Sequence, residues 1–175
     1  MALNGRKIAI LVEEGFEDTE LSEPLEAMKE AGADVTVIGS GSKQKYKGKR
    51  GEVRISADTT ANKVRAEDFD AVIVPGGYAP DKMRLHPEMV DLVKRAYDAG
   101  KIVAAVCHGP QLLISAEVVK GRKLTSWPSV AIDLKNAGAN WVDEALVRDG
   151  NIITSRKPSD LPQFNQAIIK ALEGT

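Results

Sequence analysis

Three uninterrupted runs of apolar residues most constrain how this chain can fold. They cover residues 8–12, 71–74 and 102–106 and read IAILV, AVIV and IVAAV. A strand with one face in water alternates apolar and polar residues, whereas these runs are apolar throughout and predict strands buried on both faces of a parallel sheet. Because parallel strands need crossover connections, which are usually helices, the chain is expected to alternate strands and helices.

The segments between these runs carry the expected helix signals. Apolar residues recur at helical spacing from Leu21 to Met28, and Pro24 within this stretch predicts a kink or a late start of the helix. Pro87 suits the first turn of a helix that ends at Gly100. Further elements are expected as helices around residues 111–116, 128–137 and 164–172, a strand at 35–38, a loop or small hairpin over 39–55, and a hairpin or edge pair over 146–153.

Length and composition favour one folded unit. A chain of 175 residues, 43% of them hydrophobic, lies within the size of one domain and can bury a core without disulfides or metals. We therefore expect a single α/β domain over residues 1–175, in which a mostly parallel sheet is covered by helices on both sides.

Charge and cysteine content exclude several classes of protein. Lys and Arg number 24 and Asp and Glu number 25, so the net charge of -1 argues against a dedicated binder of nucleic acid or anionic membranes. The basic cluster from Lys43 to Arg50 around Tyr46 is interpreted as a solvated loop. The single cysteine, Cys107, excludes an intramolecular disulfide and indicates a cytoplasmic location. No segment reaches the ~20 apolar residues of a membrane span, and no metal site or cofactor is expected.

The most informative position is the carboxyl end of the strand predicted at residues 102–106. Cys107 stands there between small residues, Ala105 before it and Gly109 after it, directly before a helix. This is the layout of a nucleophile elbow, a sharp turn that lifts a reactive side chain above the sheet. A lone cysteine is also a common core residue, but the elbow favours a reactive Cys107 whose pKa is lowered by the following helix.

Partners for this cysteine are harder to assign from the residues alone. No histidine follows His108, so a triad with a distant downstream histidine is excluded. His108 is either a catalytic base or a surface group, and Glu17 is either the acid that reaches Cys107 or a residue favoured by a helix dipole. Gly76 and Gly77 form either an oxyanion site or a plain turn.

Five segments together resemble the PfpI intracellular protease family, within the superfamily that includes the Parkinson-disease-associated protein and class I glutamine amidotransferase-like domains. These segments are residues 14–18 (EGFED), 75–80 (PGGYAP), 105–111 (AVCHGPQ), 121–126 (GRKLTS) and 136–138 (NAG). The likeness covers nearly the whole chain. It implies a flavodoxin-like three-layer sandwich in which Cys107 is the nucleophile, His108 its partner and Glu17 a hydrogen-bond partner of the sulfur. The backbone N–H groups of Gly77 and His108 would form the oxyanion site.

The resemblance also implies a site near a subunit interface. In the protease-like branch a glutamate of the neighbouring subunit orients the histidine, and Asp81, one methylene shorter, stands at that position. Trp127 stands where the family has a tyrosine, and Gly76, Tyr78 and Trp127 are expected to contact the substrate. Family members are dimers that assemble further into hexamers, so a homo-oligomer is expected.

Relatives with such a site differ in activity. The resemblance implies a stress-protective, cysteine-dependent hydrolase or lyase that acts on methylglyoxal or methylglyoxal-glycated proteins, as a deglycase or glyoxalase, or on peptides, as an intracellular cysteine peptidase. All three activities need a thiolate that attacks a carbonyl-like carbon beside a proton shuttle. The alternative from another class is a redox-sensing holdase chaperone with a reactive cysteine.

Overall fold

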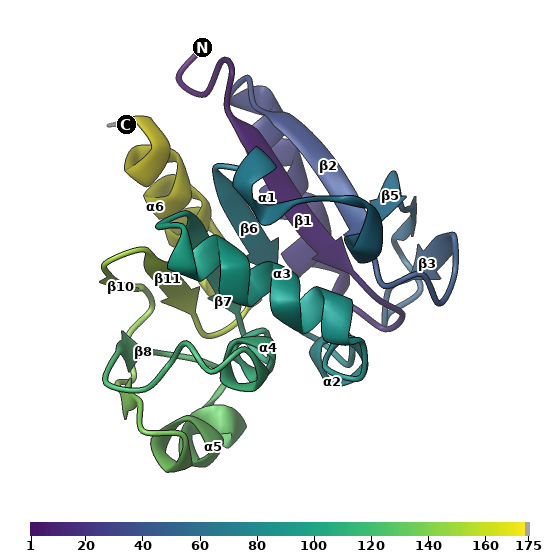
Figure 1. The fold of residues 1–175 in the computed structure, drawn as a ribbon. Helices are drawn as coiled ribbons and strands as arrows, with labels where there is room; N and C mark the ends of the chain where they lie inside the picture. Colours follow the sequence, from purple (N-terminus) through teal and green to yellow (C-terminus); the bar gives the residue numbers. More distant parts are fainter. Residues whose placement is uncertain (174–175) are drawn as a thin grey trace.

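A seven-stranded sheet forms the middle layer of the structure, a computed structural model that describes residues 1–173 (Figure 1). Its strand order is β10-β11-β7-β6-β1-β2-β5. The strands are β1 (Lys7–Val12), β2 (Asp34–Gly39), β5 (Thr59–Thr60), β6 (Ala71–Val74), β7 (Ile102–Val106), β10 (Val147–Asp149) and β11 (Ile152–Ser155). All neighbours pair in parallel except β10 and β11, which form an antiparallel edge.

The uninterrupted apolar runs are the central strands of this sheet. Every residue of β6 and β7 is buried, and so is every residue of β1 except Lys7. Because each of these strands is covered on both faces, no polar position is needed along it.

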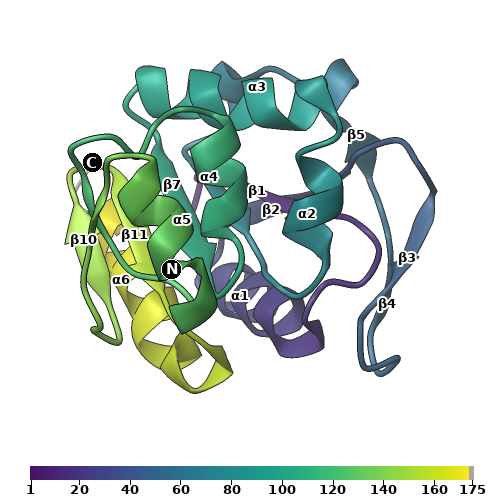
Figure 2. The same ribbon diagram turned by 90° about the horizontal axis from the view of Figure 1, so that it is seen from below.

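Helices cover both faces of the sheet. Helices α1 (Asp18–Glu30) and α6 (Leu161–Glu173) pack on one face, and α3 (Pro87–Asp98) packs on the other (Figure 2). The shorter helices α2 (Ala79–Met83) and α4 (Pro110–Ser115) lie at the end of the sheet opposite the chain termini (Figure 1). This arrangement is the flavodoxin-like three-layer sandwich, so the predicted fold class is confirmed.

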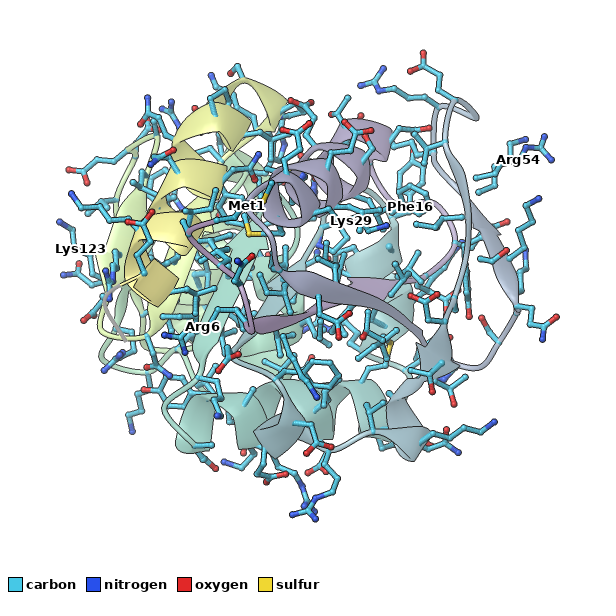
Figure 3. The ribbon with its side chains drawn as sticks, turned by 90° about the horizontal axis from the view of Figure 1, so that it is seen from above. Met1, Arg6, Phe16, Lys29, Arg54 and Lys123 are labelled. Atoms are coloured by element: carbon cyan, nitrogen blue, oxygen red, sulfur yellow. The ribbon has the colours of Figure 1, made fainter. Side chains whose placement is uncertain are left out.

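The remaining elements are short. The loop or small hairpin expected over residues 39–55 is the antiparallel hairpin of β3 (Lys45–Lys47) and β4 (Arg54–Ser56), which ends one residue later. Figure 3 shows Arg54 of this hairpin at one edge and Lys123 at the opposite edge. The others are β8 (Lys123–Leu124), β9 (Asn140–Trp141), α5 (Ala131–Asn136), η1 (Ala61–Lys63), η2 (Ala66–Asp68), η3 (Pro128–Val130) and η4 (Pro158–Asp160).

One helix boundary differs from the prediction. The proline predicted a kink or a late start; helix α1 begins at Asp18, six residues before Pro24, so the late start is wrong. The Asp18 carboxylate accepts hydrogen bonds from the backbone N–H groups of Arg50, Glu52 and Val53, at 2.8–2.9 Å. These tertiary contacts fix the first turn, and sequence periodicity does not report them.

The described part of the chain contains no helix with the length and apolar character needed to cross a membrane. Its hydrophobic core is one cluster that runs from Leu3 to Leu172. The single domain expected over residues 1–175 includes residues 174 and 175, which lie outside the described residues.

Candidate active site

Cys107 occupies a strained turn between β7 and α4. Its φ angle is +63°, in the left-handed region that residues other than glycine rarely adopt. Two hydrogen bonds hold the turn: its N–H donates to the Ser155 carbonyl at 3.0 Å, and its carbonyl accepts from the Trp127 N–H at 2.9 Å. A Cβ atom at Gly109 would lie 2.6 Å from the Val74 carbonyl oxygen, so glycine is required there. The predicted nucleophile elbow is present.

The carboxyl group beside the sulfur is Glu20, and the expected position of Glu17 is therefore wrong. Glu17 precedes helix α1 in extended conformation and binds Lys49 and Arg50 instead. Glu20 lies on the buried face of α1, four residues before Pro24 and eight before Met28, which are also buried. This spacing is the signal that could have identified Glu20, because the side chains at such positions share one helix face.

Glu20 is fully buried and lies against the first glycine of the 75–80 segment. Its Oε1 accepts the Gly76 N–H at 2.9 Å, and its Oε2 is buried without a hydrogen-bond partner among the described residues. A Cβ atom at Gly76 would lie 2.6 Å from that Oε1 and 2.9 Å from both the Cys107 Cβ and the His108 N. The carboxyl group, the cysteine and the start of α4 therefore converge around this glycine.

The acid–base properties of Glu20 follow from this burial. Burial is the main cause of a pKa of about 8 for Glu20; the Gly76 N–H opposes the upward shift, and the negative charge of Glu17 adds to it. The carboxyl group is consequently protonated at neutral pH. A protonated carboxyl can donate a hydrogen bond or a proton to the neighbouring sulfur.

The pKa of Cys107 moves opposite to the prediction. Burial raises the pKa of the thiol to about 12, with the Glu20 carboxylate as the second cause, while the N–H groups of His108 and Gly77 lower it. Helix α4 has only six residues, and its dipole does not outweigh these effects. Negative charge on either acid disfavours charge on the other, so Cys107 and Glu20 titrate as a pair.

His108 lies beside the sulfur, as predicted. Its Nδ1 is 3.4 Å from the Cys107 Sγ. Partial burial lowers the pKa of His108, and the positive charge of Lys49 lowers it further. The ring stacks on Trp127, with 6.4 Å between the ring centroids and 24° between the planes. The imidazole is therefore neutral at physiological pH. Trp127 forms an aromatic wall beside the ring, as expected for this residue.

Gly77 adopts a conformation that only glycine tolerates well. Its φ is +78°, and a Cβ atom would collide with the Glu17 N and lie 2.6 Å from the Gly15 carbonyl oxygen. The N–H groups of Gly77 and His108 both act on the Cys107 sulfur through hydrogen bonds. The two amides predicted for the oxyanion site thus face the nucleophile, and their catalytic role stays a prediction.

Other predicted site residues lie around the rim. Tyr78 is 62% exposed and Trp127 is 39% exposed, so both offer surface to a substrate. Asp81 is exposed on α2, and its predicted contact with a neighbouring subunit stays a prediction.

The basic side chains of the cluster are exposed, as expected of a solvated loop, but the segment also packs on the protein. Tyr46 is fully buried. Lys49 and Arg50 both reach the Glu17 carboxylate, with N–O distances of 3.2 and 2.5 Å. A Cβ atom at Gly48 would collide with the Asp18 carboxylate, so the loop packs closely on the start of α1. The segment from Gly48 to Val53 is therefore fixed beside the site by Glu17, which precedes α1, and by Asp18, the first residue of α1.

Fold and site define a flavodoxin-like protein with a cysteine at a strained nucleophile elbow, flanked by histidine and a buried glutamate. The chain belongs to the DJ-1/PfpI family, whose pattern matches residues 6–171.

Individual relatives agree with this assignment. General stress protein 18 of Bacillus subtilis is 42% identical over 170 residues, which cover 97% of this chain and 99% of the relative. Protein/nucleic acid deglycase 2 of Escherichia coli is 42% identical over 168 residues, covering 95% and 98% of the two chains. The crystal structure of a two-domain protein from Anabaena variabilis, with dj-1/thij/pfpi-like and ferritin-like domains, has a TM-score of 0.94 and 50% identity. The match covers 95% of this chain and 48% of the Anabaena variabilis protein.

Proposed function

We propose that this protein is a cysteine-dependent deglycase that releases lactate from early methylglyoxal adducts of thiols and amines. The name of the Escherichia coli relative, protein/nucleic acid deglycase 2, supports this activity, and that of the Bacillus subtilis relative, general stress protein 18, supports a stress-protective role. The observation that carries the proposal is the convergence of a sulfur, a protonated carboxyl, a neutral imidazole and two backbone N–H groups around Cys107.

The reaction needs no external oxidant. A methylglyoxal hemithioacetal plus one water gives the free thiol and lactate. The carbon that carries sulfur is oxidised to a carboxylate, and the neighbouring ketone carbon is reduced to an alcohol. The catalytic demand is therefore a nucleophile, a group that moves a proton between two carbons, and donors for a negatively charged oxygen.

The residues of the site meet these demands in order. The Cys107 sulfur forms a bond to the adduct carbon as the bond to the leaving thiol breaks. The protonated Glu20 supplies a proton to the leaving group and takes up the proton of the Cys107 thiol, so the carboxyl group ends protonated as it began. His108 then moves the proton from this carbon to the ketone carbon, and the hydroxyl proton passes to the former ketone oxygen, which leaves a lactoyl thioester on Cys107. Water cleaves the thioester to lactate and the free thiol. The N–H groups of Gly77 and His108 stabilise the oxygen anion at each stage.

The test separates deglycation from the other activities expected of the family. Preformed hemithioacetal of methylglyoxal with N-acetylcysteine is supplied with and without aminoguanidine, which traps free methylglyoxal, and lactate is measured. A deglycase forms lactate in both cases, whereas a glyoxalase stops when methylglyoxal is trapped. Cys107→Ser should abolish turnover. Hydrolysis of unmodified peptides without lactate formation would replace the proposal with a peptidase.

The redox-sensing chaperone gains no support from the site geometry. Oxidation by peroxide follows thiolate character and exposure, and Cys107 is 8% exposed with a pKa raised by burial.

A further inference from the structure

The amino group of Lys49 lies at the rim of the active site. Its Nζ is 3.2 Å from Oε2 of Glu17 and 5.1 Å from the centre of the Tyr78 ring. Tyr78 directly follows Gly77, whose N–H binds the Cys107 sulfur. The lysine side chain keeps 31% of its surface exposed, so a ligand can reach the charge.

The backbone that carries this lysine is anchored. The Lys49 N–H donates to the Phe16 carbonyl at 2.8 Å, and the Gly48 N–H donates to the Val53 carbonyl at 2.8 Å. The Arg50 N–H donates to the Asp18 carboxylate at 2.8 Å. Because its neighbours on both sides are fixed, the lysine stem starts from a defined position at the site.

Among the described residues the ion-pair partner of Lys49 is Glu17, and Lys49 does not have this carboxylate to itself. Glu17 carries one negative charge and is shared by Lys49 and Arg50, whose Nε lies 2.5 Å from the other carboxylate oxygen. The Asp18 carboxylate accepts three backbone N–H groups, which lower its pKa, so it keeps its negative charge, and this charge and that of Glu52 act on Arg50. Glu20 is protonated at neutral pH because of its raised pKa. The ammonium group can therefore accept a further anionic partner.

From this arrangement we infer that Lys49 is a specificity-determining residue that selects substrates carrying an anionic group, a carboxylate or a phosphate, next to the reacting carbon. The inference rests on the proposed deglycase function and names the substrate class of that site. Tyr78 holds the ammonium from one side by a cation–π contact, and Glu17 holds it from another. A substrate whose anionic group binds Lys49 has its adduct carbon placed near the sulfur, while Lys49 itself does not contact the reacting atoms.

Two matched pairs of substrates test the inference. The methylglyoxal adducts of N-acetylcysteine and of N-acetylcysteine amide differ by one carboxylate, and the adducts of deoxyguanosine monophosphate and deoxyguanosine differ by one phosphate. Rates of lactate release are measured for wild type, Lys49→Met, Lys49→Arg and the control Lys45→Met, an exposed lysine of the same hairpin. Since an exposed ion pair contributes up to about 1 kcal/mol, kcat/KM for the anionic member should fall about fivefold in Lys49→Met.

The pattern across variants separates specificity from a structural role. We expect the loss in Lys49→Met to fall on KM of the anionic member only, to be restored in Lys49→Arg, and to shrink in high salt. The pair that shows the preference identifies the anion as carboxylate or phosphate. An equal loss for charged and neutral members, or no loss for either pair, would overturn the inference. Absence of turnover of all four adducts by wild type would instead refute the proposed function.

Discussion

Replacing Glu20 by Gln tests how the Glu20 carboxyl group and the Cys107 thiol influence each other's protonation. The Glu20 carboxylate is the second cause, after burial, of the raised pKa of Cys107. Glutamine keeps the shape of the side chain and an oxygen for the Gly76 N–H, which Glu20 accepts at 2.9 Å, but it carries no charge. A like charge in contact changes a pKa by about 1 to 3, so the pKa of the thiol should fall by this amount in Glu20→Gln.

The assay is alkylation of the thiol by iodoacetamide as a function of pH, read by intact mass. Cys107 is the only cysteine in the chain, so the label reports this site alone. Because each pKa step changes the thiolate fraction tenfold below the midpoint, alkylation at pH 9 should be about 10-fold or more faster in Glu20→Gln than in wild type. Glu23→Gln, an exposed position on the same helix, is the matched control and should leave the profile unchanged.

The opposite result would refute the reasoning. A midpoint in Glu20→Gln that equals or exceeds that of wild type would mean that the carboxyl group acts mainly as a proton donor to the thiolate, and that its charge does not set the thiol pKa.

Three further outcomes follow from the same geometry. Burial raises the pKa of Glu20 from 4.5 to about 8, so the folded state binds this proton more tightly than the unfolded chain. The resulting stability should be lost as pH rises from 4.5 to about 8, by up to about 5 kcal/mol in urea unfolding, and the loss should be absent in Glu20→Gln. Gly77→Ala places a Cβ atom against the Glu17 N at positive φ and should cost about 2 kcal/mol or more, measured by thermal unfolding; a stable variant would contradict the steric argument. Asp81→Asn should lower kcat without changing the melting temperature or the oligomer mass from light scattering, and full activity would remove Asp81 from the site.

The sheet was predictable from sequence because its central strands are marked by composition alone. Residues 8–12, 71–74 and 102–106 are apolar at every position, and they are β1, β6 and β7 almost residue for residue. Elements such as β8, with two residues, are too short to show a period, and their pairing is set by contacts distant in sequence.

The candidate site was predictable only where its residues are neighbours along the chain. Cys107 and His108 follow one strand directly; the elbow pattern identifies Cys107, and the resemblance to the family indicates His108 as its partner. Glu17 was expected at the sulfur because it closely follows the first strand, and Glu20 was missed because its place on the buried face of α1 depends on how the helix packs. Lys49 was missed because its ion pair with Glu17 joins segments that no local pattern connects.

The strained turn at Cys107 also determines when a newly made chain can become reactive. Its backbone is clamped by Ser155 of β11, the last strand of the sheet, and by Trp127, and its acid partner Glu20 comes from the first helix. During synthesis the thiol therefore emerges from the ribosome well before the residues that impose its positive φ. A nascent or truncated chain that lacks β11 should carry an ordinary relaxed cysteine, so the active geometry arises only once nearly the whole domain has been translated and closed.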